Sequence, residues 1–181
     1  TPKMSSLTAK KRADGRDANQ LRALSAERSL LNRADGSSRL VVGESKLMVA
    51  VYGPGTINKR LEKMDKATLQ VTFRPVSGFS GSVETELESF IQSAVEPSIM
   101  GLLHPRTGIQ IVIQVQHSDG SELANAINAS TLALIDAGVA LKTQVVASTC
   151  ALLSDGTLIL DPTLEEEASA TAVLTFAFDK Q

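Results

Sequence analysis

Asp119, Gly120, Ser121 and Glu122 stand in a row after an apolar run and before a long alanine-rich run. This order predicts a turn at a helix N-terminus, where free N–H groups and the positive end of the helix dipole attract anions. Asp119 is a candidate N-cap, and Glu122 completes a capping-box spacing. Two interpretations stay open. The turn is a purely structural cap, or it is a former phosphate site in which Glu122 occupies the place of a phosphate ligand.

Several acidic residues follow this turn in the sequence, and carboxylate oxygens are the ligands that Mg²⁺ prefers. One interpretation is therefore a metal site for hydrolysis of RNA or DNA, and the other is a solvated acidic turn. With one cysteine and two histidines, the sequence has no zinc-ligand spacing and supports no Cys/His or Ser/His/Asp triad. The acidic group comprises Asp155, Asp161, Glu165, Glu166 and Glu167, and the candidate metal ligands are Asp155, Asp161, Glu166 and Glu167.

Basic residues offer contacts to the phosphates of single-stranded RNA. Aromatic residues make up 3% of the chain and tryptophan is absent, which argues against recognition by base stacking. The alternative is that these cations are solvated or paired with neighbouring acids such as Glu62 and Asp65. The candidate RNA-binding residues are Lys59, Arg60, Lys63, Arg74 and Arg106.

The composition is that of an ordinary water-soluble chain. Its 181 residues are 43% hydrophobic and 21% charged, which suffices for one sizeable core, and the net charge of −2 gives no overall basic excess. The single Cys150 predicts a reduced, intracellular compartment. No apolar run reaches transmembrane length and the first residues are polar, so we expect no membrane partner and no signal peptide.

Hydrophobic periodicity predicts the elements that would position these residues. An amphipathic helix is expected over residues 84–100, distorted near Pro97, and a second, alanine-rich helix ends at Gly138. The predicted fold is α/β (α+β), a sandwich of mixed β-sheets with two main helices. Residues 1–19 are expected to be a flexible basic arm, and residues 20–181 one domain. Strands are expected over residues 21–31, 33–43, 46–54, 67–75, 108–117, 145–153, 157–160 and 172–179, with an acidic connection before the last.

Taken in order, these segments resemble the RNase PH family. The resemblance covers nearly the whole chain from about residue 14, and it implies a further C-terminal helix, so we expect a truncated form. The segments that carry it are GRDANQLR (15–22), DGSSRLVVGESKLMVAVYGP (35–54), LHPRTGIQIVIQV (103–115), SDGSELANAINASTLALIDAG (118–138), SDGTLILDPT (154–163) and AVLTFAF (172–178).

The resemblance implies the fold of a phosphorolytic 3′→5′ exoribonuclease. In active members, a Gly-Ser/Thr-Arg turn holds phosphate, an acidic residue after a hairpin assists the leaving group, and arginines grip the RNA backbone. Here the turn reads Gly120-Ser121-Glu122, and a carboxylate about 5 Å from phosphate costs roughly 3 kcal/mol per charge pair at an effective dielectric constant near 20. Glu88 and Gln92 stand where arginines are expected, while Asp161 remains as a residual catalytic candidate.

We therefore expect a non-catalytic or weakly active subunit that needs no cofactor. The resemblance implies other RNase PH-like subunits of the exosome ring and single-stranded RNA as partners, in RNA processing and degradation that includes rRNA. It further implies a homodimer when the chain is isolated and a location in the nucleus, nucleolus and cytoplasm. The alternative is a stand-alone homodimeric nuclease, either phosphorolytic on RNA with inorganic phosphate or Mg²⁺-dependent and hydrolytic on RNA or DNA.

Overall fold

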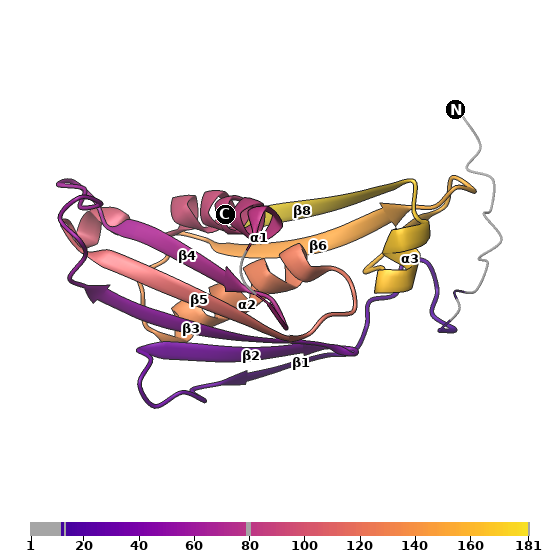
Figure 1. The fold of residues 1–181 in the computed structure, drawn as a ribbon, viewed down its shortest axis with the longest axis horizontal. Helices are drawn as coiled ribbons and strands as arrows, with labels where there is room; N and C mark the ends of the chain where they lie inside the picture. The colour runs from indigo at the N-terminus through magenta and orange to yellow at the C-terminus, as the bar shows by residue number, and fades with distance from the viewer. Residues whose placement is uncertain (1–11, 13, 79–80, 181) are drawn as a thin grey trace.

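Two β-sheets enclose a helical layer in the computed structural model, which describes Arg12, residues 14–78 and residues 81–180 (Figure 1). The larger sheet has the strand order β1-β2-β3-β5-β4, and the smaller has the order β7-β6-β8. This confirms the predicted sandwich of mixed sheets. The strands are β1 (Leu24–Arg28), β2 (Gly36–Val42), β3 (Ser45–Gly55), β4 (Thr68–Arg74), β5 (Gly108–His117), β6 (Gln144–Leu152), β7 (Leu158–Leu160) and β8 (Ala172–Lys180).

The helical layer contains the two expected main helices, α1 (Ser82–Val95) and α2 (Glu122–Asp136). The prediction of one helix over residues 84–100 was too long: α1 ends at Val95, and a 3₁₀ turn η1 (Glu96–Ser98) follows because Pro97 has no N–H to continue the ladder. A second 3₁₀ turn, η2 (Gly101–Leu103), precedes β5. No helix of the described residues is long and apolar enough to cross a membrane.

A short third helix, α3 (Leu164–Ser169), lies where the sequence analysis expected only an acidic connection. Its N-terminus is a capping box, in which Thr163 and Glu166 bond each other's backbone N–H groups. In Figure 1, α3 lies at the end of the molecule where β6 ends, beside the first described residues of the chain. This position brings α3 next to the N-terminus of α2.

Small residues let α2 pack closely between the two sheets. Toward the larger sheet, a side chain at Gly36 would lie 2.3 Å from the backbone nitrogen of Ala137, so this position accepts only glycine. Toward the smaller sheet, the Asn128 side chain accepts a bond from Ala147 N–H (2.8 Å) and donates one to the Ala147 carbonyl (2.9 Å). These contacts fix the axis of α2 and therefore the position of its N-terminal turn.

Candidate functional site

The turn formed by residues 119–122 enters α2 through two left-handed residues, Gly120 (φ 77°) and Ser121 (φ 56°). A Cβ atom at Gly120 would lie 2.7 Å from the Pro162 carbonyl oxygen, so the turn is pressed against the backbone that leads into α3. The N-cap is Ser121, and its hydroxyl bonds the Pro162 carbonyl (3.2 Å) rather than the helix. The predicted N-cap at Asp119 is therefore wrong, because its carboxylate bonds Arg22 and the Leu164 N–H.

The carboxylate that meets this turn comes from α3. The Ser121 N–H donates a 2.7 Å hydrogen bond to Oε1 of Glu167, at the place where a helix N-terminus attracts an anion. Glu167, and not a bound anion, therefore accepts this N–H, while Glu122 stands at the position where the resemblance implies a phosphate-binding arginine. Burial raises the pKa of Glu167, and the charges of Glu122 and Asp119 raise it further, while the Ser121 bond and the charge of Arg22 oppose these effects.

Asp161, the residual catalytic candidate, is buried and fully engaged by Arg22. It is 6% exposed, and it accepts hydrogen bonds from the Arg22 backbone N–H (3.0 Å), Nε (2.9 Å) and Nη2 (2.5 Å). Burial opposes ionisation of Asp161, but the bonds and charge of Arg22 outweigh it and hold its pKa below the ordinary value. The backbone of Asp161 is left-handed (φ 51°). This arrangement makes Asp161 an anchor for the chain rather than a group ready to transfer a proton.

Arg12 and Arg16, which the sequence analysis placed in a flexible arm, are bonded to the same region. Arg12 pairs with Glu166 and donates from Nη1 to the Leu160 carbonyl (2.7 Å). Arg16 donates from Nη1 to the Asp161 carbonyl (3.3 Å). These bonds connect Arg12 and Arg16 to the domain, whereas residues 1–11 and 13 of the predicted arm lie outside the described part of the chain.

The candidate metal ligands do not converge. Asp161 and Glu166 are paired with arginines, and Glu167 bonds Ser121. Asp155 lies apart from them, in the turn between β6 and β7. Within the described residues, no group of three or more His, Cys, Asp or Glu side chains is placed to hold a metal ion. The geometry therefore gives the Mg²⁺ interpretation no site at these four residues.

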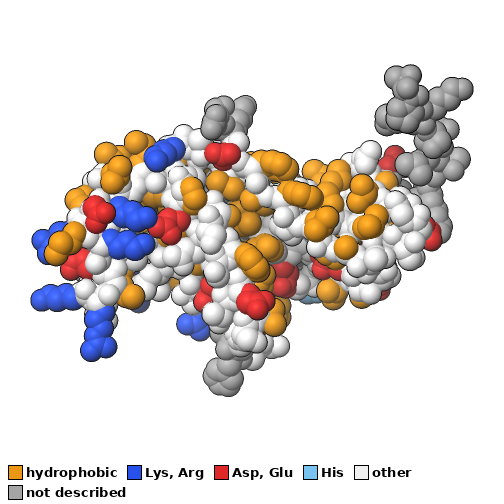
Figure 2. Space-filling model, turned by 90° about the horizontal axis from the view of Figure 1, so that it is seen from above, with side chains coloured by type: hydrophobic (Ala, Val, Ile, Leu, Met, Phe, Trp, Pro, Cys, Tyr) orange, Lys and Arg blue, Asp and Glu red, His pale blue; other side chains and the backbone are white. Residues whose placement is uncertain are grey.

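The candidate RNA-binding residues lie at two ends of the larger sheet. Lys59, Arg60 and Lys63 are in the loop between β3 and β4, and Arg106 is in the loop before β5, where its Nε pairs with Glu62 (2.7 Å). Arg74 ends β4 at the opposite end of a seven-residue strand, about 20 Å away. Figure 2 shows Lys and Arg side chains gathered at the end of the molecule that carries these loops. The first four residues therefore form one basic surface, and Arg74 stands apart from it.

Glu88 and Gln92 of α1 stand where the resemblance implies arginines, and the structure gives Glu88 a structural role. Glu88 accepts a 2.8 Å hydrogen bond from the Phe73 N–H and so ties α1 to β4. The sequence did not single out Arg22, and it indicated Glu167 only as a candidate metal ligand and not as a partner of the 119–122 turn. The Thr163–Glu166 capping-box spacing was a readable signal for α3, but nothing local in the sequence pairs Arg22 with a residue 139 positions later.

The chain matches the 3′ exoribonuclease family, with domain 1 over residues 20–140 and domain 2 over residues 143–181. It is 41% identical over 167 residues to the exosome complex exonuclease RRP46 homolog of Arabidopsis thaliana, which covers 92% of this chain and 70% of that protein. The homolog of Oryza sativa subsp. japonica is 40% identical over 156 residues, covering 86% of this chain and 66% of that protein. The chain therefore spans about two thirds of the length of these relatives.

Solved structures agree with this match. The crystal structure of rice (Oryza sativa) Rrp46 superposes with a TM-score of 0.86 at 35% identity, covering 94% of this chain and 86% of that one. The Archaeoglobus fulgidus exosome with RNA bound to the active site superposes with a TM-score of 0.82 at 18% identity, covering 94% and 78%. The second likeness shows a shared fold.

Proposed function

Because the chain belongs to the 3′ exoribonuclease (RNase PH) family, we propose that it is a non-catalytic or weakly active subunit of the exosome ring. It contributes to 3′→5′ processing and degradation of RNA, including rRNA, through ring assembly and RNA contact, and it requires no cofactor. Its partners are other RNase PH-like subunits and single-stranded RNA, and its location is the nucleus, nucleolus and cytoplasm. The names of its relatives support this role, since the Arabidopsis and rice proteins are called exosome complex exonuclease RRP46 homologs.

One observation carries the non-catalytic part of the proposal: the Glu167 carboxylate accepts the Ser121 N–H at the start of α2. A phosphate ion at this turn would have to displace Glu167 and would still face Glu122, which stands where the resemblance implies an arginine. At about 5 Å and an effective dielectric constant near 20, each such pair of unit charges costs about 3 kcal/mol. Phosphate, the nucleophile of phosphorolysis, is therefore excluded by charge as well as by space.

Apolar surface supports the assembly part of the proposal. On the face of the smaller sheet that turns away from α2, the register places Val146 beside Phe178 and Cys150 beside Leu174. Val146 is 59% exposed and Phe178 is 63% exposed. Figure 2 shows hydrophobic side chains spread over the molecule seen from this side. Burial of such surface favours association, so the isolated chain forms a homodimer and the ring subunit binds its neighbours.

The experiment measures phosphate-dependent release of nucleoside diphosphates from 3′-labelled single-stranded RNA by the purified chain. We expect no release above a phosphate-free control, both in EDTA and with Mg²⁺, and we expect a ring-sized particle when the chain is mixed with its RNase PH-like partner subunits. An active family member run in parallel shows that the assay detects phosphorolysis. Robust release of nucleoside diphosphates in EDTA that depends on phosphate would overturn the proposal. Release of nucleoside monophosphates that depends on Mg²⁺ and not on phosphate would support the hydrolytic alternative.

A further inference from the structure

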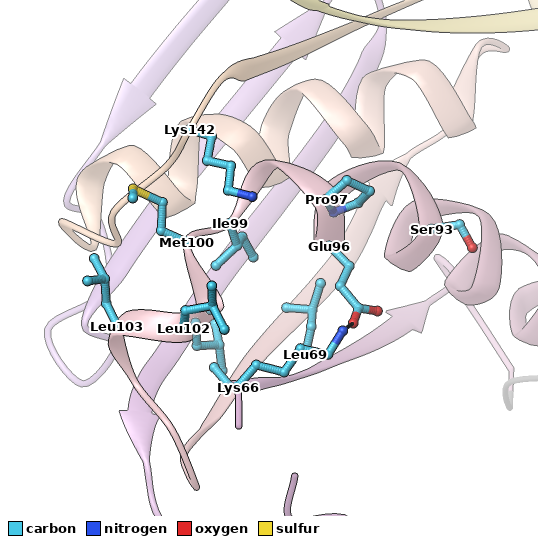
Figure 3. A pocket seen from close by; sticks show the side chains of 13 residues that line it. Lys66, Leu69, Ser93, Glu96, Pro97, Ile99, Met100, Leu102, Leu103 and Lys142 are labelled. Carbon is cyan, nitrogen blue, oxygen red and sulfur yellow. Dashed lines mark hydrogen bonds and ion pairs between the residues drawn. The ribbon is translucent and has the colours of Figure 1, made fainter. Parts of the chain in front are cut away.

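A well-formed hollow lies at the opposite end of the larger sheet from the 119–122 turn. It has a volume of about 530 Å³ and opens between the end of α1, the η2 turn and the start of β4 (Figure 3). Leu69 and Ile99 lie within it, and Met100, Leu102 and Leu103 line one side. The volume is in the range of sites that take a ligand or a peptide side chain.

Backbone hydrogen bonds hold the walls of this pocket in place. The Ala67 N–H bonds the Gly101 carbonyl (2.9 Å), the Met100 N–H bonds the Ala140 carbonyl (2.9 Å) and the Lys142 N–H bonds the Ser98 carbonyl (2.7 Å). Three segments that are distant in sequence are thereby tied together. The pocket is formed before any ligand arrives, so a ligand need not order it.

Two lysines stand at the pocket with different surroundings. Lys66 is bonded to Glu96 (2.9 Å), which also pairs with Lys63 (3.5 Å). Lys142 extends its ammonium group over Ile99 toward Pro97, and it forms no ion pair with any residue that the structure describes (Figure 3). Glu96 is therefore shared between Lys63 and Lys66, and Lys142 adds a positive charge that no carboxylate of the described residues pairs, beside an apolar hollow. The complementary ligand carries negative charge next to an apolar group.

The surface around the mouth favours a protein segment over RNA. Leu102 is 72% exposed and Leu103 is 57% exposed, so apolar surface continues past the pocket onto the rim. An aliphatic side chain covers such a surface well, whereas bases are held by stacking on aromatic rings, and no aromatic residue lines this pocket. Exposed leucines around a preformed hollow are typical of sites where a partner inserts an anchor residue.

We propose that this pocket docks an acidic segment of a partner protein that inserts a leucine or phenylalanine anchor and sets a carboxylate against Lys142. The anchor lies on Leu69 and Ile99 and is covered at the rim by Leu102 and Leu103. The site is independent of the proposed exclusion of phosphate, because it lies beyond the other end of β5 and shares no residue with the 119–122 turn. It gives the subunit a second contact besides the faces that build a ring.

The test uses the full chain and a fluorescein-labelled peptide in which a Leu-Phe pair is flanked by Asp and Glu. Two matched peptides replace Leu-Phe with Ser-Ser, or the acids with Asn and Gln. Binding is followed by fluorescence anisotropy, and the contact is located by methyl NMR shifts at Leu102, Leu103 and Ile99. The variants are Leu102→Ser and Lys142→Glu, both at exposed positions that leave folding intact.

The control variants are Leu158→Ser, an exposed leucine in β7 (60% against 72% for Leu102), and Lys46→Glu at the start of β3. We expect the Leu-Phe peptide to bind, both altered peptides to bind at least about tenfold more weakly, and Leu102→Ser and Lys142→Glu each to weaken binding by a similar factor. The two control variants should bind as the wild type does.

Three results would overturn the proposal. The first is that the Leu-Phe peptide binds no better than its Ser-Ser counterpart. The second is that Leu102→Ser and Lys142→Glu leave binding unchanged. The third is that an oligoadenylate binds with shifts at the same methyl groups and displaces the peptide, which would assign the pocket to RNA.

Discussion

Replacing Asp161 with asparagine tests whether this residue anchors the chain or takes part in chemistry. The substitution keeps the shape and the left-handed backbone, which asparagine tolerates, but it removes the charge that Arg22 contacts through three donors. Breaking a buried ion pair from one side costs about 3–5 kcal/mol. Arg22 retains Asp119 (3.2 Å), so we expect the lower end, about 3 kcal/mol.

The assay is urea unfolding, with thermal unfolding as a second measure. A loss of about 3 kcal/mol corresponds to a fall of roughly 6–12 °C in Tm for a domain of this size. The matched control is Asp65→Asn, which removes the same charge from an exposed loop position and should change the unfolding free energy by less than about 0.5 kcal/mol. If Asp161→Asn is no more destabilising than Asp65→Asn, the anchoring role is refuted.

The stabilisation that the Asp161–Arg22 ion pair provides should decrease at acid pH. Because the pKa of Asp161 is lower in the folded chain than in the unfolded chain, its ion pair contributes stability that is fully present above the unfolded pKa of about 4. That contribution is lost as the pH falls through the folded pKa. The gap in unfolding free energy between the wild type and Asp161→Asn should therefore be complete at pH 7 and should shrink below about pH 4. A gap that stays constant into acid would contradict the charge argument.

Four further predictions concern the turn, the basic surface and assembly. Glu122→Arg alone should leave sulfate affinity nearly unchanged in calorimetry, because the new arginine pairs with Glu167, whereas Glu122→Arg combined with Glu167→Gln should raise that affinity. Equal sulfate affinities of the single and the double variant would contradict the proposal that Glu167 occupies the turn. Gly120→Ala should lower the unfolding free energy by more than about 1 kcal/mol, since its Cβ would meet the Pro162 carbonyl at φ +77°. Charge reversal at Lys59 and Lys63 should weaken single-stranded RNA binding regardless of sequence, with the salt slope falling by roughly 0.7 per lost contact; dependence on base identity would refute this. Light scattering of the isolated chain should give a dimer mass, and a strict monomer would count against the exposed apolar face as an interface.

Much of the fold could be predicted from hydrophobic periodicity. Apolar residues alternate along β5, and this pattern predicted correctly which face of the strand packs on the core. The four residues of that face, Ile109, Ile111, Ile113 and Val115, are all buried. The alanine-rich run gave α2, because small residues at helical spacing indicate a helix packed on more than one side. The end of α1 was placed too late, although Pro97 marked the point where the ladder fails.

The candidate site could be predicted only in part. The position of the 119–122 turn was readable, because glycine and a polar run punctuate the start of a helix. Its occupant was not, because Glu167 reaches Ser121 from a helix 46 residues later in the chain. Pairings of this kind depend on tertiary packing, which no local pattern of residues encodes.

The bonds that join the first described residues to Asp161 and to Glu166 of α3 also set an order of events during synthesis. Arg22 finds Asp161 across 139 residues, and Arg12 finds Glu166 across 154. At about 5–20 residues per second, a ribosome needs roughly 7–28 s to add 139 residues. Throughout that interval the arginines that emerge first have none of these partners, and water must solvate them. The Arg22–Asp161 and Arg12–Glu166 bonds therefore form among the last steps of folding, and a nascent chain that stops before Asp161 lacks both.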